Sequence, residues 1–558
     1  MNRQQRRALR KQDPITHHPD QPWWLQGVAH HQRGELPQAE QCYGKIAASH
    51  PLYYVVLGNW GALALQQSQL TKAMTLLQRA LAIKPNFVDA LINLAIVFKE
   101  MSRLLEAETC CRKVLAIQPT ELRAQGNLGV ILKNLGRLDA AEDCFRTVLA
   151  TRPDHVESLN NLGNLLKDLG RLEEAALYYR QALTIHPNHV EILSNLGMTY
   201  LSLAQLNEAV TTLRRAIALS PDHVEALNHL GITYKELGCF TEAETYYRRV
   251  LVLSPRQADA HHNLGNVLKE LGRLEESVAC YQQAIQIKPD WAMARKHLGD
   301  VLRTLNRTDE AIKCYRQALA LDPQDSLGLS FALAALGCAA LPSRASQDQL
   351  ERIYAKRARY WDHIADDRYR GADLVAKALK SQLSSPVATM LDAGCGTGMV
   401  GVLLRDLTTR LDGIDLSVDM LDKAREKGIY DALHQGDLET FMTEHPATYD
   451  AIVCAATLIH FGDLTSVFSA CAKALRVGGY FVFTVFLHEA DPEGSAVVVN
   501  PLEGFERGGC YAHGKGHVTQ AALAAGLAVM QLQTELHEYV HDKAVHALVG
   551  VLCRGTDL

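Results

Sequence analysis

The sequence lacks the features that would assign it at once to a membrane, metal-binding or nucleic-acid-binding class. It contains no run of 18 apolar residues, so we expect no transmembrane helix. None of its 13 cysteines forms a C-x-x-C pair or a zinc-finger spacing, which predicts reduced thiols and no metal site. The net charge of -5 argues against a nucleic-acid partner. Together these absences favour a globular, cytoplasmic protein.

The length of 558 residues predicts several domains. The first 19 residues are expected to form a basic tail, with Arg3, Arg6, Arg7, Arg10 and Lys11. No apolar core follows these charges, so the tail does not have the pattern of a secretory signal.

A period of 34 residues runs through the N-terminal half. A small residue such as Gly129 stands ten residues after most of the periodic prolines, and a second small residue such as Ala141 is followed four residues later by an aromatic or apolar one such as Phe145. This pattern resembles the tetratricopeptide repeat, in which small residues let two helices approach and the aromatic ring fills the gap beside them. It predicts an α-solenoid of nine repeats over residues 20–325. The periodic prolines are Pro51, Pro85, Pro119, Pro153, Pro187, Pro221, Pro255, Pro289 and Pro323.

Asparagine recurs at one repeat position that lies off the apolar stripe, two residues before the small residue. Its amide offers a donor and an acceptor to an extended peptide backbone. The array resembles that of the O-linked N-acetylglucosamine transferases, where an asparagine row holds peptide, and the resemblance covers only the repeats. The alternative is that these side chains tie neighbouring helices or face water. The predicted partner groove contains Asn59, Asn93, Asn127, Asn161, Asn195 and Asn263.

Residues 326–346 are expected to connect the repeats to a second domain. The apolar stretch 327–342 predicts a helix that caps the stack or docks the next domain, and residues 343–346 indicate a linker.

From residue 347 to 558 strands alternate with helices, which predicts a doubly wound, Rossmann-like α/β domain with a mostly parallel seven-stranded sheet. The last two strands lack an intervening helix and are therefore expected to be antiparallel. The predicted strands are 387–391, 411–414, a short one before Gly436, 449–454, 479–486, 528–535 and 545–553.

The most informative segment of this domain is the turn after its first strand, Asp392 to Gly398, with three alternating glycines. Residues 396–401 fit the dinucleotide fingerprint G-x-G-x-x-G. The longer string from Asp392 resembles motif I of the class I S-adenosylmethionine-dependent methyltransferases. Both interpretations need a carboxylate at the end of the second strand to accept from a ribose, and Asp415 stands there.

Further segments favour the methyltransferase interpretation. Residues 435–438 (Gln-Gly-Asp-Leu), 449–454 and 475–479 resemble, in the right order, the segments that follow motif I in that family. The whole chain resembles bacterial proteins that fuse tetratricopeptide repeats to a class I methyltransferase domain.

This resemblance implies an enzyme with S-adenosylmethionine as its cofactor. Asp392 is then expected to hold the turn or the cofactor amine, Asp415 the ribose, and Asp437 with Leu438 the adenine. The cofactor-binding residues implied are Asp392, Gly394, Cys395, Gly396, Gly398, Asp415, Leu416, Asp437, Leu438 and Ala455.

Histidines supply the candidates for proton transfer. His460, six residues after the fourth strand, is the catalytic candidate, either as a general base or as a residue of the pocket rim. His513 is expected in a loop or at the substrate mouth. His537, His541 and His546 lack a carboxylate or cysteine at metal spacing and are expected at solvated or edge positions.

Three functions remain open. The leading one is a methyltransferase whose repeats recruit a protein or peptide partner that is also the acceptor. The second is a small-molecule or glycan methyltransferase whose repeats serve localisation or assembly. The third is a non-catalytic repeat scaffold.

Overall fold

The computed structural model describes residues 18–358, 361–362, 369–499, 510–540 and 543–555, which form two compact units divided between Pro255 and Arg256. The basic residues of the predicted tail and His541 lie outside the described residues. No helix among the described residues is long and apolar enough to cross a membrane.

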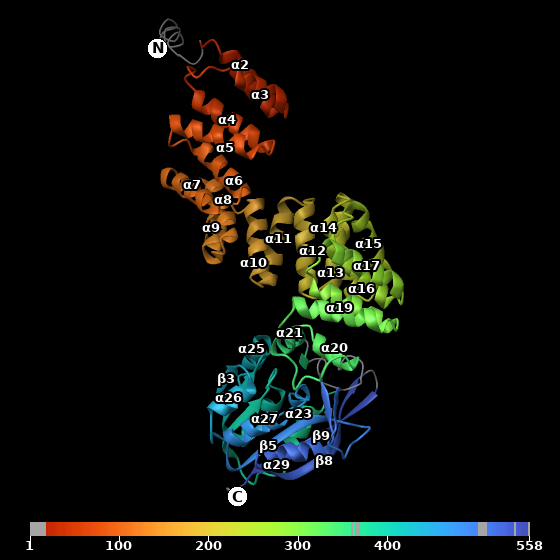
Figure 1. Cartoon of the computed structure of the whole chain (residues 1–558). Coiled ribbons are helices and arrows are strands. Elements are labelled where there is room, and N and C mark those ends of the chain that lie inside the picture. The colour runs from red at the N-terminus through yellow and green to blue at the C-terminus, as the bar shows by residue number, and fades with distance from the viewer. Residues whose placement is uncertain (1–17, 359–360, 363–368, 500–509, 541–542, 556–558) are drawn as a thin grey trace. The chain divides into compact units, whose positions relative to one another are not determined.

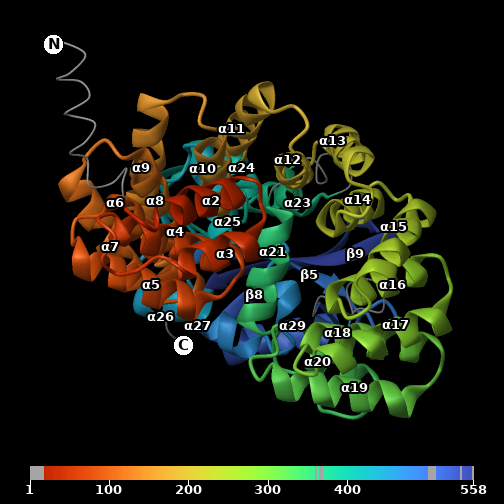
Figure 2. The same cartoon turned by 90° about the horizontal axis from the view of Figure 1, so that it is seen from above.

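The first unit consists of consecutive pairs of antiparallel helices that lie side by side (Figures 1 and 2). Its helices are α2 (Gln21–Gln32), α3 (Leu36–Gly44), α4 (Tyr53–Gln66), α5 (Leu70–Ile83), α6 (Val88–Glu100), α7 (Leu104–Ile117), α8 (Leu122–Asn134), α9 (Leu138–Thr151), α10 (Val156–Asp168), α11 (Leu172–Ile185), α12 (Val190–Ser202), α13 (Leu206–Leu219), α14 (Val224–Glu236) and α15 (Phe240–Leu253).

The packing inside a pair follows the predicted contact between a small residue and an aromatic one. A Cβ atom at Gly129 of α8 would lie 2.6 Å from the ring of Phe145 on α9. The same contact recurs between Gly163 and Tyr179, at 2.7 Å. Only glycine leaves room for these rings, and both Phe145 and Tyr179 are fully buried. The repeated sequence pattern therefore sets the distance between the paired helices.

The second unit begins with two more helix pairs, which complete nine pairs from α2 to α19 among the described residues. The predicted helix over 327–342 is much shorter, because α20 ends at Ala335 and Gly337 then adopts a positive φ of 69°. The helices of this part are α16 (Ala258–Glu270), α17 (Leu274–Ile287), α18 (Ala292–Thr304), α19 (Thr308–Leu321), α20 (Leu329–Ala335) and α21 (Gln347–Arg357).

The rest of the second unit is built on a nine-stranded sheet. Strands β3, β2, β1, β4 and β5 are parallel neighbours in that order, β9 is antiparallel to β5, and β8 is antiparallel to β9, as predicted for the last pair. The strands are β1 (Val387–Ala393), β2 (Thr408–Asp415), β3 (Ala432–Gln435), β4 (Tyr449–Cys454), β5 (Leu475–Leu487), β6 (Val497–Val499), β7 (Tyr511–His513), β8 (Leu527–Val540) and β9 (Lys543–Arg554).

Two of these strands depart from the seven predicted. β6 and β7 have three residues each and pair with each other in the segment between β5 and α29. Runs this short carry no periodicity that distinguishes a strand from a loop, which is why the sequence pattern did not predict them.

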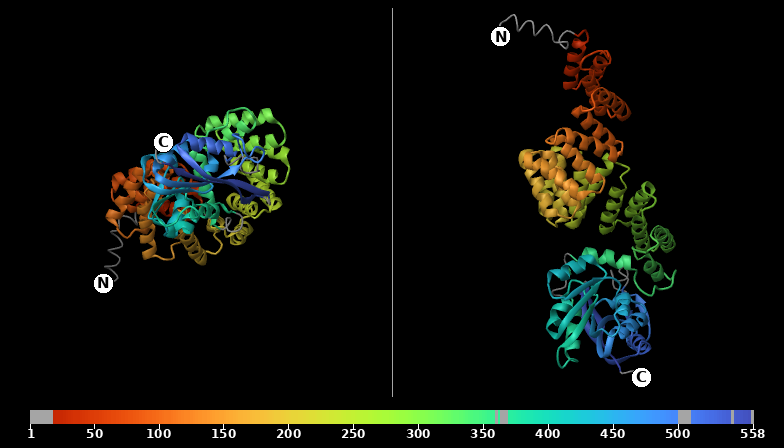
Figure 3. Two further views of the ribbon diagram at one scale, coloured as in Figure 1. Left: turned by 90° about the horizontal axis from the view of Figure 1, so that it is seen from below. Right: turned by 90° about the vertical axis from the view of Figure 1, so that its left-hand side faces the viewer.

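Helices cover both faces of the sheet (Figure 3). One face packs against α23 (Gly371–Lys380) and α24 (Met399–Leu404), around Val482 and Val551. The other packs against α26 (Leu438–Glu444), α27 (Thr465–Ala474) and α29 (Lys515–Ala524), around Phe468 and Phe481. A sheet buried on both faces and wound by helices is the doubly wound α/β fold. The helix α25 (Val418–Glu426) follows β2.

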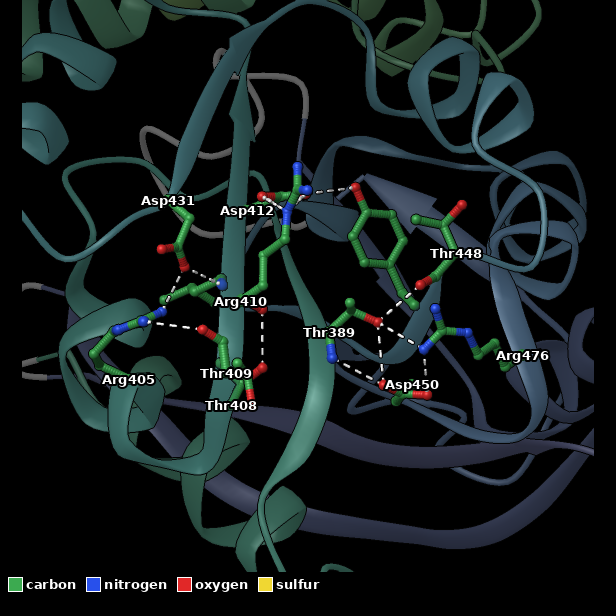
Figure 4. Close-up of polar contacts among 12 residues, drawn as sticks. Thr389, Arg405, Thr408, Thr409, Arg410, Asp412, Asp431, Thr448, Asp450 and Arg476 are labelled. Carbon is green, nitrogen blue, oxygen red and sulfur yellow. Dashed lines mark hydrogen bonds and ion pairs between the residues drawn. The ribbon is translucent and has the colours of Figure 1, made fainter.

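Polar side chains tie the strands together near their amino ends (Figure 4). The Asp450 carboxylate accepts hydrogen bonds from the Thr389 backbone N–H at 2.8 Å and from Arg476 Nη1 at 2.8 Å. Asp412 accepts from Arg410 Nε at 2.9 Å and from the Tyr449 hydroxyl at 3.2 Å. These contacts stabilise the end of the sheet that is remote from the glycine turn.

Candidate functional site

A cavity of about 560 Å³ lies at the carboxyl ends of the parallel strands, where doubly wound sheets bind ligands. Its walls come from the turns after β1, β2, β3 and β4 and from α21. Of the predicted site residues, Asp392, Gly398 and Asp437 are not in its wall, and those that line it are Gly394, Cys395, Gly396, Asp415, Leu416, Leu438, Ala455 and His460.

The turn after β1 is shaped by its glycines. Gly394, Gly396 and Gly398 have positive φ values of 78°, 53° and 91°, a region that side-chain-bearing residues rarely adopt. A Cβ atom at Gly394 would also lie 2.1 Å from Thr457 Oγ1. Cys395 is buried in this turn, and burial raises the pKa of its thiol, so it is a packing residue rather than a nucleophile.

Asp415 joins the end of β2 to the glycine turn. Its Oδ2 accepts a hydrogen bond from the Gly396 backbone N–H and its Oδ1 one from Ser417, both at 2.9 Å. Burial raises the pKa of this carboxyl, and the backbone donors oppose that rise. A carboxylate has about four acceptor sites, more than the backbone donors of Ser417, Gly396 and Leu416 occupy, so it can still accept from a hydroxyl of a ligand in the cavity.

Asp392 lies behind the turn and is fully buried. Its Oδ2 accepts a hydrogen bond from the Tyr430 hydroxyl at 2.7 Å, whereas Oδ1 accepts none of normal geometry from the described residues. The nearby Gly401 N–H favours the charged form only weakly. Burial therefore dominates and raises the pKa of Asp392 to about 7.

Asp437 is occupied by contacts with the protein itself. Its Oδ1 caps α26 by accepting from the Thr440 backbone N–H at 3.1 Å, and its Oδ2 accepts from Arg344 and Gln347, each at 2.9 Å. Arg344 lies 93 residues earlier in the chain, so no local sequence pattern indicated this ion pair. The predicted contact of Asp437 with an adenine therefore stays a prediction, and its neighbours Gly436 and Leu438 form the cavity wall.

His460 faces a residue that the sequence analysis did not identify. The ring is 5% exposed, its Nε2 lies 2.7 Å from the Tyr354 hydroxyl and its Nδ1 lies 3.9 Å from Cys510 Sγ. Tyr354 comes from α21, outside every motif recognised in the sequence, and lines the cavity with Trp361 and Tyr369. Only the aromatic content of this region could have drawn attention to it.

The remaining histidines agree with the predictions only in part. His513 is fully buried on β7, 2.9 Å from the ring of His517, and does not line the cavity; burial lowers its pKa to about 3. His537 lies near the end of β8, a strand at the edge of the sheet, but it is fully buried rather than solvated because the rings of Tyr369 and Phe486 pack against it. His546 is partly exposed on β9. No cluster of three metal-ligating side chains is present in the described part of the chain.

Only two of the six asparagines in the predicted partner groove form side-chain hydrogen bonds with other described residues. All six side chains are half-buried. Asn195 donates to Asn160 on the preceding helix pair at 3.2 Å, and Asn59 contacts Tyr43, as the alternative interpretation requires. Asn93, Asn127, Asn161 and Asn263 make no side-chain hydrogen bond to other described residues. These four amides are available to a ligand.

Comparison with known proteins finds different families in the helical repeats and in the domain with the sheet. The family described as "Methyltransferase domain" matches residues 391–483. Families described as "Tetratricopeptide repeat" match residues 21–44, 120–188, 166–231, 222–290 and 256–324.

Among curated proteins, the chain is 28% identical over 204 residues to the "Ubiquinone biosynthesis O-methyltransferase" of Xanthomonas campestris pv. campestris (strain B100). It is 27% identical over 198 residues to the protein of the same name from Xanthomonas euvesicatoria pv. vesicatoria (strain 85-10). Each match covers 34% of this chain and 82% of the relative. The repeats are similar to the crystal structure of MamA, at 27% identity over 30% of this chain and 96% of that one, but the TM-score of 0.28 supports no argument.

Proposed function

We propose that this chain, a methyltransferase with an N-terminal run of tetratricopeptide repeats, transfers a methyl group from S-adenosylmethionine to a hydroxyl group of a small aromatic acceptor. The observation that carries the proposal is a single cavity whose wall contains both the glycine turn at Gly394–Thr397 and the buried His460. We assign residues 20–325 to the repeats, 326–346 to the connection and 347–558 to the methyltransferase domain.

The chemistry of the walls fits S-adenosylmethionine. The glycine turn exposes backbone without side chains, and Asp415 offers carboxylate lone pairs at its edge. Behind this wall, Asp392 holds a buried oxygen without a partner among the described residues. A cationic amine near that oxygen would compensate its burial. The volume of about 560 Å³ lies within the range of about 300–1,000 Å³ that is usual for small-molecule sites.

When bound, the donor supplies an activated methyl group, and the protein has to position the acceptor and receive its proton. Asp415 and the glycine turn would hold the donor, and Leu416 and Leu438 would exclude water from it. The wall contains several groups that can accept a proton, and among them are His460 and its hydrogen-bond partner Tyr354.

Two observations favour a small aromatic acceptor. The rings of Tyr354, Trp361 and Tyr369 line the cavity and provide flat apolar surfaces for another ring. The relatives at 27–28% identity are named as O-methyltransferases of ubiquinone biosynthesis. The repeats would then bind a protein partner that localises or assembles the enzyme.

A second candidate function is methylation of a protein or peptide that the repeats recruit. It is favoured by the half-buried asparagines Asn93, Asn127, Asn161 and Asn263, whose amides have no partner among the described residues. In this case the acceptor itself occupies the asparagine row.

Methyl-labelled S-adenosylmethionine distinguishes the two candidates. The full chain is incubated with donor and cell extract, and the label is separated into dialysable and protein-bound fractions. A small acceptor places the label in the dialysable fraction, whereas a protein acceptor places it in the protein fraction. The Asp415→Ala variant is the control, and label that persists unchanged in this variant would refute the assignment of the site.

A further inference from the structure

The two ring nitrogens of His460 both face protein atoms rather than open cavity. Nε2 lies 2.7 Å from the Tyr354 hydroxyl, and Nδ1 lies 3.9 Å from Cys510 Sγ. The histidine is 5% exposed, while Tyr354 is half-buried and forms cavity wall. Of the two side chains, Tyr354 is therefore the more accessible to an acceptor hydroxyl in the cavity.

Helix α21 is fixed in the position that presents this tyrosine. Before the helix, the Ser346 hydroxyl donates to the Asp325 carbonyl at 2.9 Å, and within it Arg352 Nε donates to the Ser326 carbonyl at 3.0 Å. The Ala345 N–H donates to the backbone carbonyl of His460, also at 2.9 Å. The residues that follow the last helix pair, Asp325 and Ser326, and the turn that carries His460 thus both fix the start of α21.

We propose that Tyr354 is the catalytic residue that takes the proton of the acceptor hydroxyl and passes its own proton to Nε2 of His460. This inference rests on the proposed function. The acceptor oxygen forms its bond to the methyl carbon as the carbon–sulfur bond breaks and that electron pair stays on sulfur. The acceptor proton moves to the Tyr354 oxygen, the Tyr354 proton moves to Nε2, and His460 becomes an imidazolium.

The surroundings suit a tyrosine that relays a proton without ionising by itself. Burial raises the pKa of the Tyr354 phenol, and Cys510, Asp415 and Glu538 add to that rise. The Arg357 guanidinium, 5.9 Å from the centre of the Tyr354 ring, opposes it. At neutral pH the phenol therefore stays protonated. The relay requires that it donates to Nε2, which places the ring proton of neutral His460 on Nδ1, toward the cysteine.

The tautomer of His460 tests the relay without any turnover. The ¹⁵N NMR spectrum of the full chain at pH 8, with the resonances assigned by their loss in His460→Asn, is expected to show a protonated Nδ1 and an unprotonated Nε2. A protonated Nε2 would overturn the proposal, since such a nitrogen cannot accept the tyrosine proton.

Single-turnover methylation of catechol and 3,4-dihydroxybenzoate supplies the second test. Tyr354→Phe is expected to lower the rate by about 10²–10⁴-fold, the usual contribution of a general base, while calorimetric affinity for S-adenosylmethionine stays within about twofold. Because the two residues act in series, His460→Asn and the double variant should show similar losses. Because only a neutral His460 can accept the proton, the rate of the parent should rise with pH and then level off. In Tyr354→Phe this plateau should be absent.

Tyr449→Phe is the matched control, because it removes another phenol hydroxyl, which donates to Asp412 at 3.2 Å, from the far end of the sheet. It should keep the parent pH profile. A Tyr354→Phe rate and profile equal to the parent would refute the relay alone. A parent that methylates neither probe would refute the proposed aromatic acceptor, and the relay with it.

Discussion

Replacing Asp392 by asparagine should make the methyltransferase domain less stable than the parent at low pH and more stable than the parent at high pH. The carboxyl is fully buried, and burial raises its pKa from 3.8 to about 7. The folded state therefore binds this proton more tightly than the unfolded state does. The resulting stabilisation is complete below about pH 4 and is lost as the pH rises through about 7.

The size of the effect follows from the change in pKa. A difference of about 3 between folded and unfolded states corresponds to about 4 kcal/mol, as an upper value, at about 1.36 kcal/mol for each unit of pKa. Asparagine keeps an oxygen for the Tyr430 hydroxyl but places an amide where Oδ1 has no partner among the described residues, at a cost of about 1–3 kcal/mol at every pH. The variant should thus be the less stable protein at pH 4 and the more stable one at pH 8.

Urea unfolding of the full chain without donor, at intervals from pH 4 to pH 8, measures this difference. Asp412→Asn is the control, because it replaces a buried aspartate that is paired with Arg410 at 2.9 Å. It should lower the free energy of unfolding at pH 8. If the free energies of unfolding of Asp392→Asn and the parent differ by the same amount at every pH from 4 to 8, the proposed burial of an unpaired carboxyl is refuted.

Three further predictions concern the glycines and the asparagines. Gly394→Ala should abolish binding of S-adenosylmethionine in calorimetry because its Cβ would lie 2.1 Å from Thr457 Oγ1. The control Gly428→Ala, at a glycine that also has a positive φ, of 63°, but has open space around it, should retain binding. Equal binding by both variants would contradict the role of the turn. Gly129→Ala should cost about 1–3 kcal/mol in denaturant unfolding because it meets Phe145 at 2.6 Å, while Gly126→Ala in the same helix, whose nearest atom is 4.0 Å away, should be neutral or stabilising. Replacing Asn127 and Asn161 together by alanine should weaken capture of a protein partner from extract and leave catechol methylation unchanged; a loss of catechol methylation would show that these residues also support the active site.

The periodic part of the fold was the most predictable from the sequence. Each repeat places the same residue types at the same contacts, so Gly129 and Phe145 identify a helix pair without knowledge of the rest. Residues 449–454 were likewise predicted to the residue, because an apolar run bounded by turns is characteristic of a buried strand.

The contacts that join distant segments were not predictable. Tyr354 meets His460 across 106 residues, and Arg344 meets Asp437 across 93. Neither contact corresponds to a recognisable residue spacing in the sequence, because tertiary packing determines where the helix α21 lies. His513 and His537 were misplaced for a related reason: burial of a polar side chain depends on what covers it, which local patterns do not encode.

Titration of S-adenosylmethionine into the full chain, with Asp415→Ala beside it, is the most direct test of the account. The parent should bind, and the variant should bind about 10–100-fold more weakly, as expected from the loss of a charged hydrogen-bond acceptor worth about 1.5–3 kcal/mol. Circular dichroism of the variant should match that of the parent. Absence of binding by the parent, or equal affinity in the two proteins, would contradict the assignment of this cavity as the methyl-donor site.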